Sequence, residues 1–103
     1  MSSQAFRPTP KDKSLLSVYD GNKIEAGSAW NHYTGVLRLA SLGVMGIAEV
    51  DIEGLNLGVR ADPLPDFPEH AVIDFSGFTK NQVEKKAKQL RDRAEAMGWL
   101  YRA

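Results

Sequence analysis

Residues 71–99, with the sequence AVIDFSGFTKNQVEKKAKQLRDRAEAMGW, decide the predicted fold. The run Ala71–Phe75 is apolar and rich in β-branched residues, which predicts a buried strand. The segment from Lys80 to Met97 predicts a helix, because its apolar side chains recur at steps of four, three, four and three residues: Val83, Ala87, Leu90, Ala94 and Met97. One narrow apolar stripe of this kind is typical of a helix that packs on a sheet.

Both ends of this helix carry signals that define its length. Thr79 and Gln82 have the spacing of a capping box, in which each side chain binds the backbone amide of the other residue. Gly98 stands where many helices end on a residue with a positive φ angle, and Trp99 follows where that motif places an apolar contact.

The first third of the chain predicts one strand and one helix. The strand is expected over Ser14–Tyr19 and ends at the turn pair Asp20-Gly21. Residues 25–39 predict a helix, because apolar residues recur there at three- and four-residue steps. The heaviest side chains of that stripe are Trp30, Tyr33 and Leu37.

The middle of the chain predicts a strand, a short helical turn and a loop. The strand is expected over Val44–Val50, and a single helical turn over Glu49–Gly54 ends at its glycine. Three prolines prevent a helix over residues 61–69, which are expected to form an extended loop that leads into the strand at residue 71.

The order of these elements predicts an α+β or small α/β fold, in which a three- or four-stranded sheet carries two main helices on one face. Residues 1–13 contain two prolines and, after Met1, only Phe6 as a large apolar side chain, so they predict a mobile N-terminal arm. Residues 14–103 are expected to form a single globular domain.

The composition excludes several classes of function. The chain has 103 residues, 13 basic and 13 acidic side chains, and no cysteine. A balanced charge argues against a protein dedicated to nucleic acids or membrane surfaces, and the absence of cysteine excludes thiolate chemistry and cysteine-based metal sites. The polar N-terminus lacks the apolar segment of a signal peptide, and the uncharged stretch over residues 39–48 is too short to span a membrane. A cytoplasmic location and no membrane partner are therefore expected.

His70 and Ser76 flank the predicted strand and are the candidate catalytic residues. Ser76 follows the strand, where α/β enzymes often hold active residues, but it lies in no nucleophile-elbow motif. His70 and Asp74 share one face of the strand at a separation of about 13 Å, which is too far to share a proton. The favoured interpretation of His70 is a hydrogen-bonded residue that holds the corner between loop and strand.

The two histidines, His32 and His70, would form a zinc site only if the fold brought them together with an acidic residue. For His32, a partly exposed position on the first helix is favoured over a metal ligand. The sequence contains neither of the common glycine-rich phosphate loops. It therefore predicts no metal site and no cofactor.

A second set of residues suits binding rather than catalysis. Phe6 and Arg7 combine an aromatic anchor with a bidentate donor on a stiff backbone. The proline loop carries the carboxylates of Asp62 and Asp66 and leads into His70. We expect Phe6 and Arg7 either to pack on the surface of the domain or to bind a partner, with the acidic loop as the natural counterpart of Arg7.

The predicted helix over residues 80–97 concentrates positive charge. It carries six basic and three acidic side chains, whereas residues 14–79 carry nine acidic and three basic ones. Its basic face, made of Lys85, Lys88 and Arg91, could bind nucleic acid or an acidic protein. A solvated face is favoured, because glutamates are spaced to pair with these bases and no aromatic platform flanks the arginines.

Four stretches have a familiar pattern: Phe6–Asp12 (FRPTPKD), Leu16–Val18 (LSV), His32–Thr34 (HYT) and Asp62–Phe75 (DPLPDFPEHAVIDF). Together they resemble a group of small uncharacterised bacterial proteins, and the resemblance spans most of the chain. It implies a bacterial or phage-like setting and does not imply an activity.

These observations favour a small, non-enzymatic accessory protein that binds another protein, as antitoxins, immunity proteins and other operon partners do. Two alternatives stay open. One is a small enzyme or ligand-binding domain built on the proline loop, His70 and Ser76. The other is a nucleic-acid-binding protein that uses the basic helix.

Overall fold

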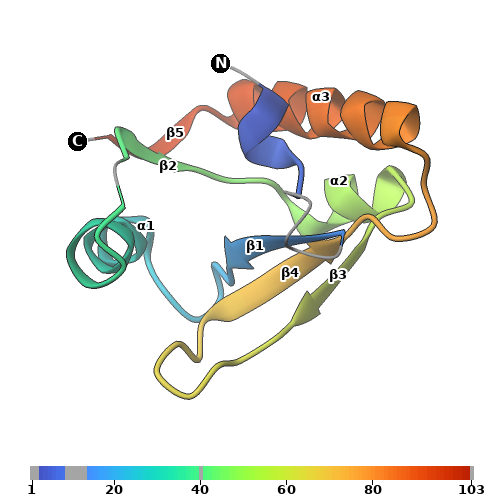
Figure 1. The fold of residues 1–103 in the computed structure, drawn as a ribbon. Coiled ribbons are helices and arrows are strands. Elements are labelled where there is room, and N and C mark those ends of the chain that lie inside the picture. The colour runs from blue at the N-terminus through green and yellow to red at the C-terminus, as the bar shows by residue number, and fades with distance from the viewer. Residues whose placement is uncertain (1–2, 9–13, 40, 103) are drawn as a thin grey trace.

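The computed structural model describes residues 3–8, 14–39 and 41–102, and its secondary structure confirms the α+β class (Figure 1). The elements, in chain order, are the 3-10 helix η1 (Ser3–Phe6), β1 (Leu15–Tyr19), α1 (Ala26–Asn31), the π-helix η3 (His32–Val36), β2 (Gly43–Met45), α2 (Glu49–Gly54), β3 (Gly58–Ala61), β4 (His70–Asp74), α3 (Lys80–Met97) and β5 (Trp99–Arg102). Among these described residues, no helix is long and apolar enough to cross a membrane.

The strands form two antiparallel sheets. The larger has the order β1-β4-β3, and the smaller pairs β2 with β5. The strand predicted over residues 71–75 is therefore the centre of the larger sheet, and four of its five residues in β4 are buried. A central strand has both edges paired and both faces covered, which explains why its sequence is a nearly continuous apolar run.

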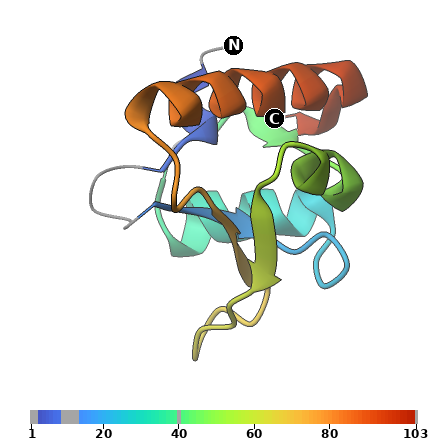
Figure 2. The same ribbon diagram turned by 90° about the vertical axis from the view of Figure 1, so that its right-hand side faces the viewer.

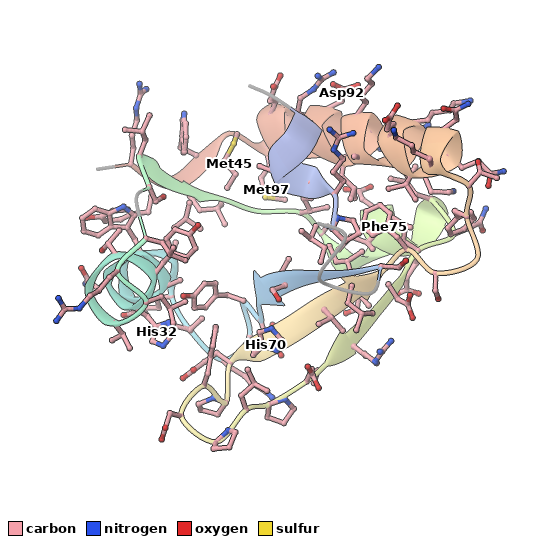
Figure 3. All side chains as sticks on the ribbon, in the orientation of Figure 1. His32, Met45, His70, Phe75, Asp92 and Met97 are labelled. Atoms are coloured by element: carbon pink, nitrogen blue, oxygen red, sulfur yellow. The ribbon has the colours of Figure 1, made fainter. Side chains whose placement is uncertain are left out.

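The main core lies between the larger sheet, α2 and α3. In Figures 1 and 2, α3 crosses one side of the molecule above the sheet, and Figure 3 places Phe75 between them. The buried core cluster consists of Ile52, Leu57, Ile73, Phe75 and Leu90. Full burial of one such side chain contributes roughly 1.5–3 kcal/mol, so this cluster holds α3 on the sheet.

The helix α3 has the predicted bounds because both predicted end signals are present. The Gln82 amide donates to Thr79 Oγ1 at 3.2 Å, and the Thr79 amide donates to Gln82 Oε1 at 2.9 Å. Gly98 has φ 81° and ψ −175°, so its φ is positive as predicted but its ψ is extended. The chain therefore leaves the helix directly as a strand, and Trp99 begins β5 instead of closing a helix cap.

The strand predicted over Val44–Val50 is wrong in its length. Only residues 43–45 pair, because β5 offers Trp99 as its last partner, opposite Met45. The helical turn over Glu49–Gly54 is confirmed as α2. The strands β3 and β5 were not predicted.

The first predicted helix changes its geometry half-way. After α1 the chain becomes the π-helix η3, in which the Leu37 amide donates to the His32 carbonyl at 3.0 Å. The Thr34 hydroxyl donates to the Trp30 carbonyl at 2.8 Å, and this competition for a helix acceptor disturbs the regular ladder. The wider turn rotates the residues that follow, and Leu37, one of the heaviest side chains of the predicted apolar stripe, is 41% exposed.

The described part of the N-terminal arm packs on the domain. The helix η1 lies against α3 (Figure 1), and Phe6 packs against the core cluster. Arg7 Nη1 lies 3.2 Å from Glu84 Oε1 of α3, so the predicted pairing of Arg7 with the acidic loop is wrong. Residues 9–13 of the arm lie outside the described residues, and the mobility of the arm stays a prediction.

Candidate functional site

The residues predicted for a catalytic site lie at opposite ends of β4. His70 begins the strand, and Ser76 follows its last residue. Six residue steps of extended chain separate them by about 20 Å. The structure therefore does not bring His70 and Ser76 into one site.

His70 is buried, with 8% of its surface exposed, and both of its ring nitrogens have oxygen partners. Nδ1 lies 2.9 Å from the Asp62 carbonyl oxygen, and Nε2 lies 3.1 Å from Ser17 Oγ. Because a carbonyl only accepts, Nδ1 carries the proton and Nε2 accepts from the Ser17 hydroxyl. The Asp62 carboxylate also lies 3.3 Å from Nδ1. This geometry supports the structural interpretation, in which His70 joins the proline loop to two strands.

An aromatic cluster surrounds this corner and brings the two histidines near each other (Figure 3). The Phe67 ring lies between them, 4.5 Å from the His32 ring and 5.2 Å from the His70 ring. Tyr19 Oη lies 2.7 Å from His32 Nδ1, and its ring lies 4.9 Å from the Phe67 ring. Sequence patterns missed Tyr19 and Phe67, because neither belongs to an apolar stripe and their contacts join distant segments.

The Tyr19 phenol is a neutral member of this cluster. Burial raises the pKa of Tyr19, and the nearby groups of Tyr33 and Glu69 raise it further. A higher pKa keeps the proton on the phenol at neutral pH. Tyr19 therefore supplies a hydrogen bond and an aromatic contact rather than a nucleophile.

The cluster does not have the composition of a metal centre. Among the residues that the structure describes, no three His, Asp or Glu side chains lie together as metal ligands would. The two imidazoles both contact the apolar Phe67 ring and do not share an acidic residue.

Ser76 lies in the turn after β4 and belongs to a second polar group. The Ser76 amide donates to Asp74 Oδ1 at 2.8 Å, and Arg60 Nη1 donates to Asp74 Oδ2 at 3.0 Å. These hydrogen bonds, from Ser76 first and Arg60 next, lower the pKa of Asp74. Asp74 thus closes the turn as a carboxylate, and Ser76 serves that turn.

The basic residues of α3 differ in how their charges are placed. Lys85 and Lys88 are exposed. Arg91 lies 3.1 Å from Asp92 and 4.0 Å from Glu95, and Arg93 lies 3.5 Å from Asp51. These pairs spread acidic groups along the helix, which supports a solvated face rather than a continuous surface for nucleic acid.

The chain was compared with protein-family models, with curated proteins and with solved structures. None of the three comparisons finds a match. The resemblance to small bacterial proteins therefore stays a prediction that depends on the four sequence stretches.

Large apolar side chains are exposed in η3, in the segment between η3 and β2, and at the start of β5. We use the name apolar end for Val36, Leu37, Leu39, Leu42 and Trp99, whose exposed fractions range from 40% to 78%. Trp30 Nε1 donates to the Ser41 carbonyl at 3.1 Å, which anchors the connection beside β2. The Trp99 ring lies so close to Gly43 that an added Cβ atom would be 2.9 Å from it.

A cavity of about 930 Å³ lies between the larger sheet and the segment that begins with β2. Its walls are mainly apolar and include Leu16, Val18, Val44, Ile47 and Ile73. Phe6, Met97 and Leu100 also line it, and Met45 and Met97 lie near each other in Figure 3. A volume of this size is in the range of sites that accept small molecules or peptide side chains.

Proposed function

We propose that this protein is a small, non-enzymatic accessory protein of the bacterial cytoplasm that binds another protein through its apolar end. The observation that carries the proposal is the exposure of five large apolar side chains in η3, in the segment that follows it and at the start of β5, up to 78% for Leu42. Exposed apolar patches on small domains commonly mark protein interfaces.

The residue types at the apolar end also fit an interface. Arg102 lies over the Trp99 ring at 5.6 Å, and Trp and Arg are the residues most often found at the energetic centre of protein interfaces. Arg38 lies between two residues of the patch and has a positive φ of 56°. Two arginines beside an apolar surface favour a partner whose own surface is apolar with acidic groups at its margin.

The other functions considered from the sequence have less support. A small enzyme would need His70 and Ser76 to cooperate, but they flank opposite ends of β4. Binding of nucleic acid through α3 would need a continuous positive face, but acidic partners lie beside Arg91 and Arg93. A protein partner at the apolar end needs neither arrangement.

The proposal is tested with a photo-crosslinking amino acid placed at Leu39 in the full chain, expressed in the native host. We expect one crosslinked partner protein, and we expect Leu42→Asp to abolish the crosslink, because the partner would bury a carboxylate in place of the most exposed side chain of the apolar end. The same crosslinker at Lys88 on α3 is the matched control and should yield no adduct. Adducts at Lys88 alone, or crosslinks only between copies of this chain, would contradict the proposal.

A further inference from the structure

The outer edge of β1 is unpaired within the described part of the chain. At one end of the β1–β4 ladder the Phe75 amide donates to the Ser14 carbonyl, and at the other the Asp20 amide donates to the Glu69 carbonyl, each at 2.8 Å. Hydrogen-bonded residues alternate along an antiparallel pair. The odd-numbered residues of β1 therefore direct their backbone N–H and C=O groups away from β4. These residues are Leu15, Ser17 and Tyr19.

The two edges of the larger sheet differ in how they are protected. The strand β3 carries Arg60 and leads into the prolines of the loop, and both features discourage the addition of another strand. The strand β1 has the sequence LLSVY, with no charge and no proline. An uncharged, unprotected edge is the kind of strand to which an extended chain adds.

The cavity of about 930 Å³ lies beside β1, which contributes four of its five residues to the lining. Leu16 and Val18 share the face of the sheet that also supplies Ala71 and Ile73 of β4 to the lining. A strand added to the outer edge of β1 would continue this face, so every second side chain of the added strand would point to the side of the cavity. An unpaired strand edge beside an apolar hollow matches an extended polypeptide better than a compact small molecule.

The charges around the cavity define the chemistry of that polypeptide. Asp20, Glu25 and Glu49 are among the lining residues, and the two glutamates are exposed. The lining includes one basic residue, Arg60, whose guanidinium group binds Asp74. The carboxylates would therefore attract basic side chains of the polypeptide, and Arg60 would repel them little because its charge is paired with Asp74.

We infer that the outer edge of β1 binds an extended segment of a partner protein as an added strand, with apolar side chains in the cavity and basic side chains at its acidic margin. The inference rests on the proposed function, since it assumes that the protein binds another protein, but it uses a different surface. Residues of η1, α1 and the segment after β2 also line the cavity.

The experiment measures binding of the synthetic peptide Ac-Lys-Thr-Val-Thr-Val-Thr-Lys-amide to the full chain by calorimetry, because the lysines and valines of this peptide share one face of a strand. We expect saturable binding, and at least about tenfold weaker binding of the matched peptide with Glu in place of Lys. Hydrogen exchange provides the structural readout. The amides of Leu15, Ser17 and Tyr19 should exchange rapidly in the free protein and become protected by the peptide.

Peptides that carry N-methyl groups on alternate residues test strand pairing directly. Methylation removes the donors of one edge of the peptide, so one of the two alternate sets should abolish binding. Equal binding of both methylated peptides and the unmodified peptide would overturn the inference. Absence of saturable binding, or protection without the expected charge preference, would overturn it as well.

Variants of the protein separate this surface from the apolar end. The double variant Glu25→Gln with Glu49→Gln should weaken binding of the lysine peptide by about two- to fivefold for each carboxylate removed. Glu53→Gln, on α2 but outside the cavity lining, is the matched control and should change nothing. Leu42→Asp should keep full peptide binding, so a failure of the proposed function at the apolar end is distinguishable from a failure at β1.

Discussion

The side chain of His70 is held by two oxygen partners on different segments of the chain. The Asp62 carbonyl comes from the end of β3, and the Ser17 hydroxyl comes from β1. Because the imidazole is buried, loss of the ring removes two part-buried hydrogen bonds between distant segments. His70 therefore stabilises the corner of the sheet, and we expect its loss to affect stability rather than a reaction.

We predict that His70→Ala lowers the free energy of unfolding by about 1–3 kcal/mol, because two buried hydrogen bonds and the packing on Phe67 are lost. Urea denaturation followed by circular dichroism measures the change. Asp62→Ala is the control, since it keeps the backbone carbonyl that His70 binds, and it should cost about 0–1 kcal/mol. Equal losses in the two variants would show that the carboxylate, and not the carbonyl, is the important partner.

Asp74 makes stability depend on pH in a defined direction. The hydrogen bonds from Ser76 and Arg60 lower the pKa of Asp74 below its ordinary value of 3.8. A lowered folded-state pKa stabilises the fold when the carboxylate is ionised, so the contribution is complete at neutral pH and is lost as the pH falls through the folded-state pKa. We predict that Asp74→Asn lowers the free energy of unfolding by about 1 kcal/mol at neutral pH. The difference should shrink as the pH falls below the ordinary value of 3.8, and a difference that did not change with pH would contradict the assignment.

At the scale of elements, Gly98 links α3 to β5 through a backbone conformation that other residues rarely adopt. With φ 81° and ψ −175°, it turns a helix into a strand within one residue. We predict that Gly98→Ala destabilises the protein by about 1–3 kcal/mol. Gly54→Ala is the matched control, because Gly54 ends α2 with open space around it, and alanine there should be neutral or stabilise by about 0.5–1 kcal/mol. Gly98→Ala should therefore lower the melting temperature, whereas Gly54→Ala should leave it unchanged or raise it.

The elements that the sequence predicts well are those whose causes are local. The capping box, the glycine after Met97 and the four-three spacing together define α3, and each lies inside the helix or beside it. The strand β3 is defined by its partner β4, and β5 by β2, so the four residues of each carry no sufficient signal of their own. The π-helix was missed for a similar reason, since the contact of the Thr34 hydroxyl with a carbonyl is not visible in apolar spacing.

In the candidate site, too, the features with local causes could be predicted from the sequence and those that depend on distant contacts could not. The interpretation of His70 as a structural corner could be derived from the extended geometry around it, which separates it from Asp74. The hydrogen-bond partners of His70 could not be derived from the sequence, because Ser17 lies 53 residues away along the chain. The pairing of Arg7 was predicted with the wrong acid, since several acidic segments compete in a single sequence and only the packing of η1 on α3 selects Glu84.

At the scale of the whole molecule, the N-terminal segment works as a part of the core. Phe6 packs against the core cluster, and Arg7 pairs with Glu84. We predict that deletion of residues 1–8 lowers the free energy of unfolding by about 1–3 kcal/mol. Phe6→Ala should account for most of the loss, while Arg7→Ala should cost about 0–1 kcal/mol, as exposed ion pairs do. An unchanged melting temperature after the deletion would contradict the packing of η1 on α3.

The small sheet also has a consequence for the order in which the protein is made. Within the part of the chain that the structure describes, the strand β2 pairs with β5 alone, and Met45 lies opposite Trp99, which comes more than 50 residues later in the chain. During synthesis, β2 therefore leaves the ribosome long before its partner, and the ladder between them cannot close until residues 99–102 have emerged. The larger sheet needs nothing beyond Phe75 to form its ladders. A ribosome stalled between these two points would carry a chain with one sheet complete and the apolar side chains beside β2 open to a chaperone.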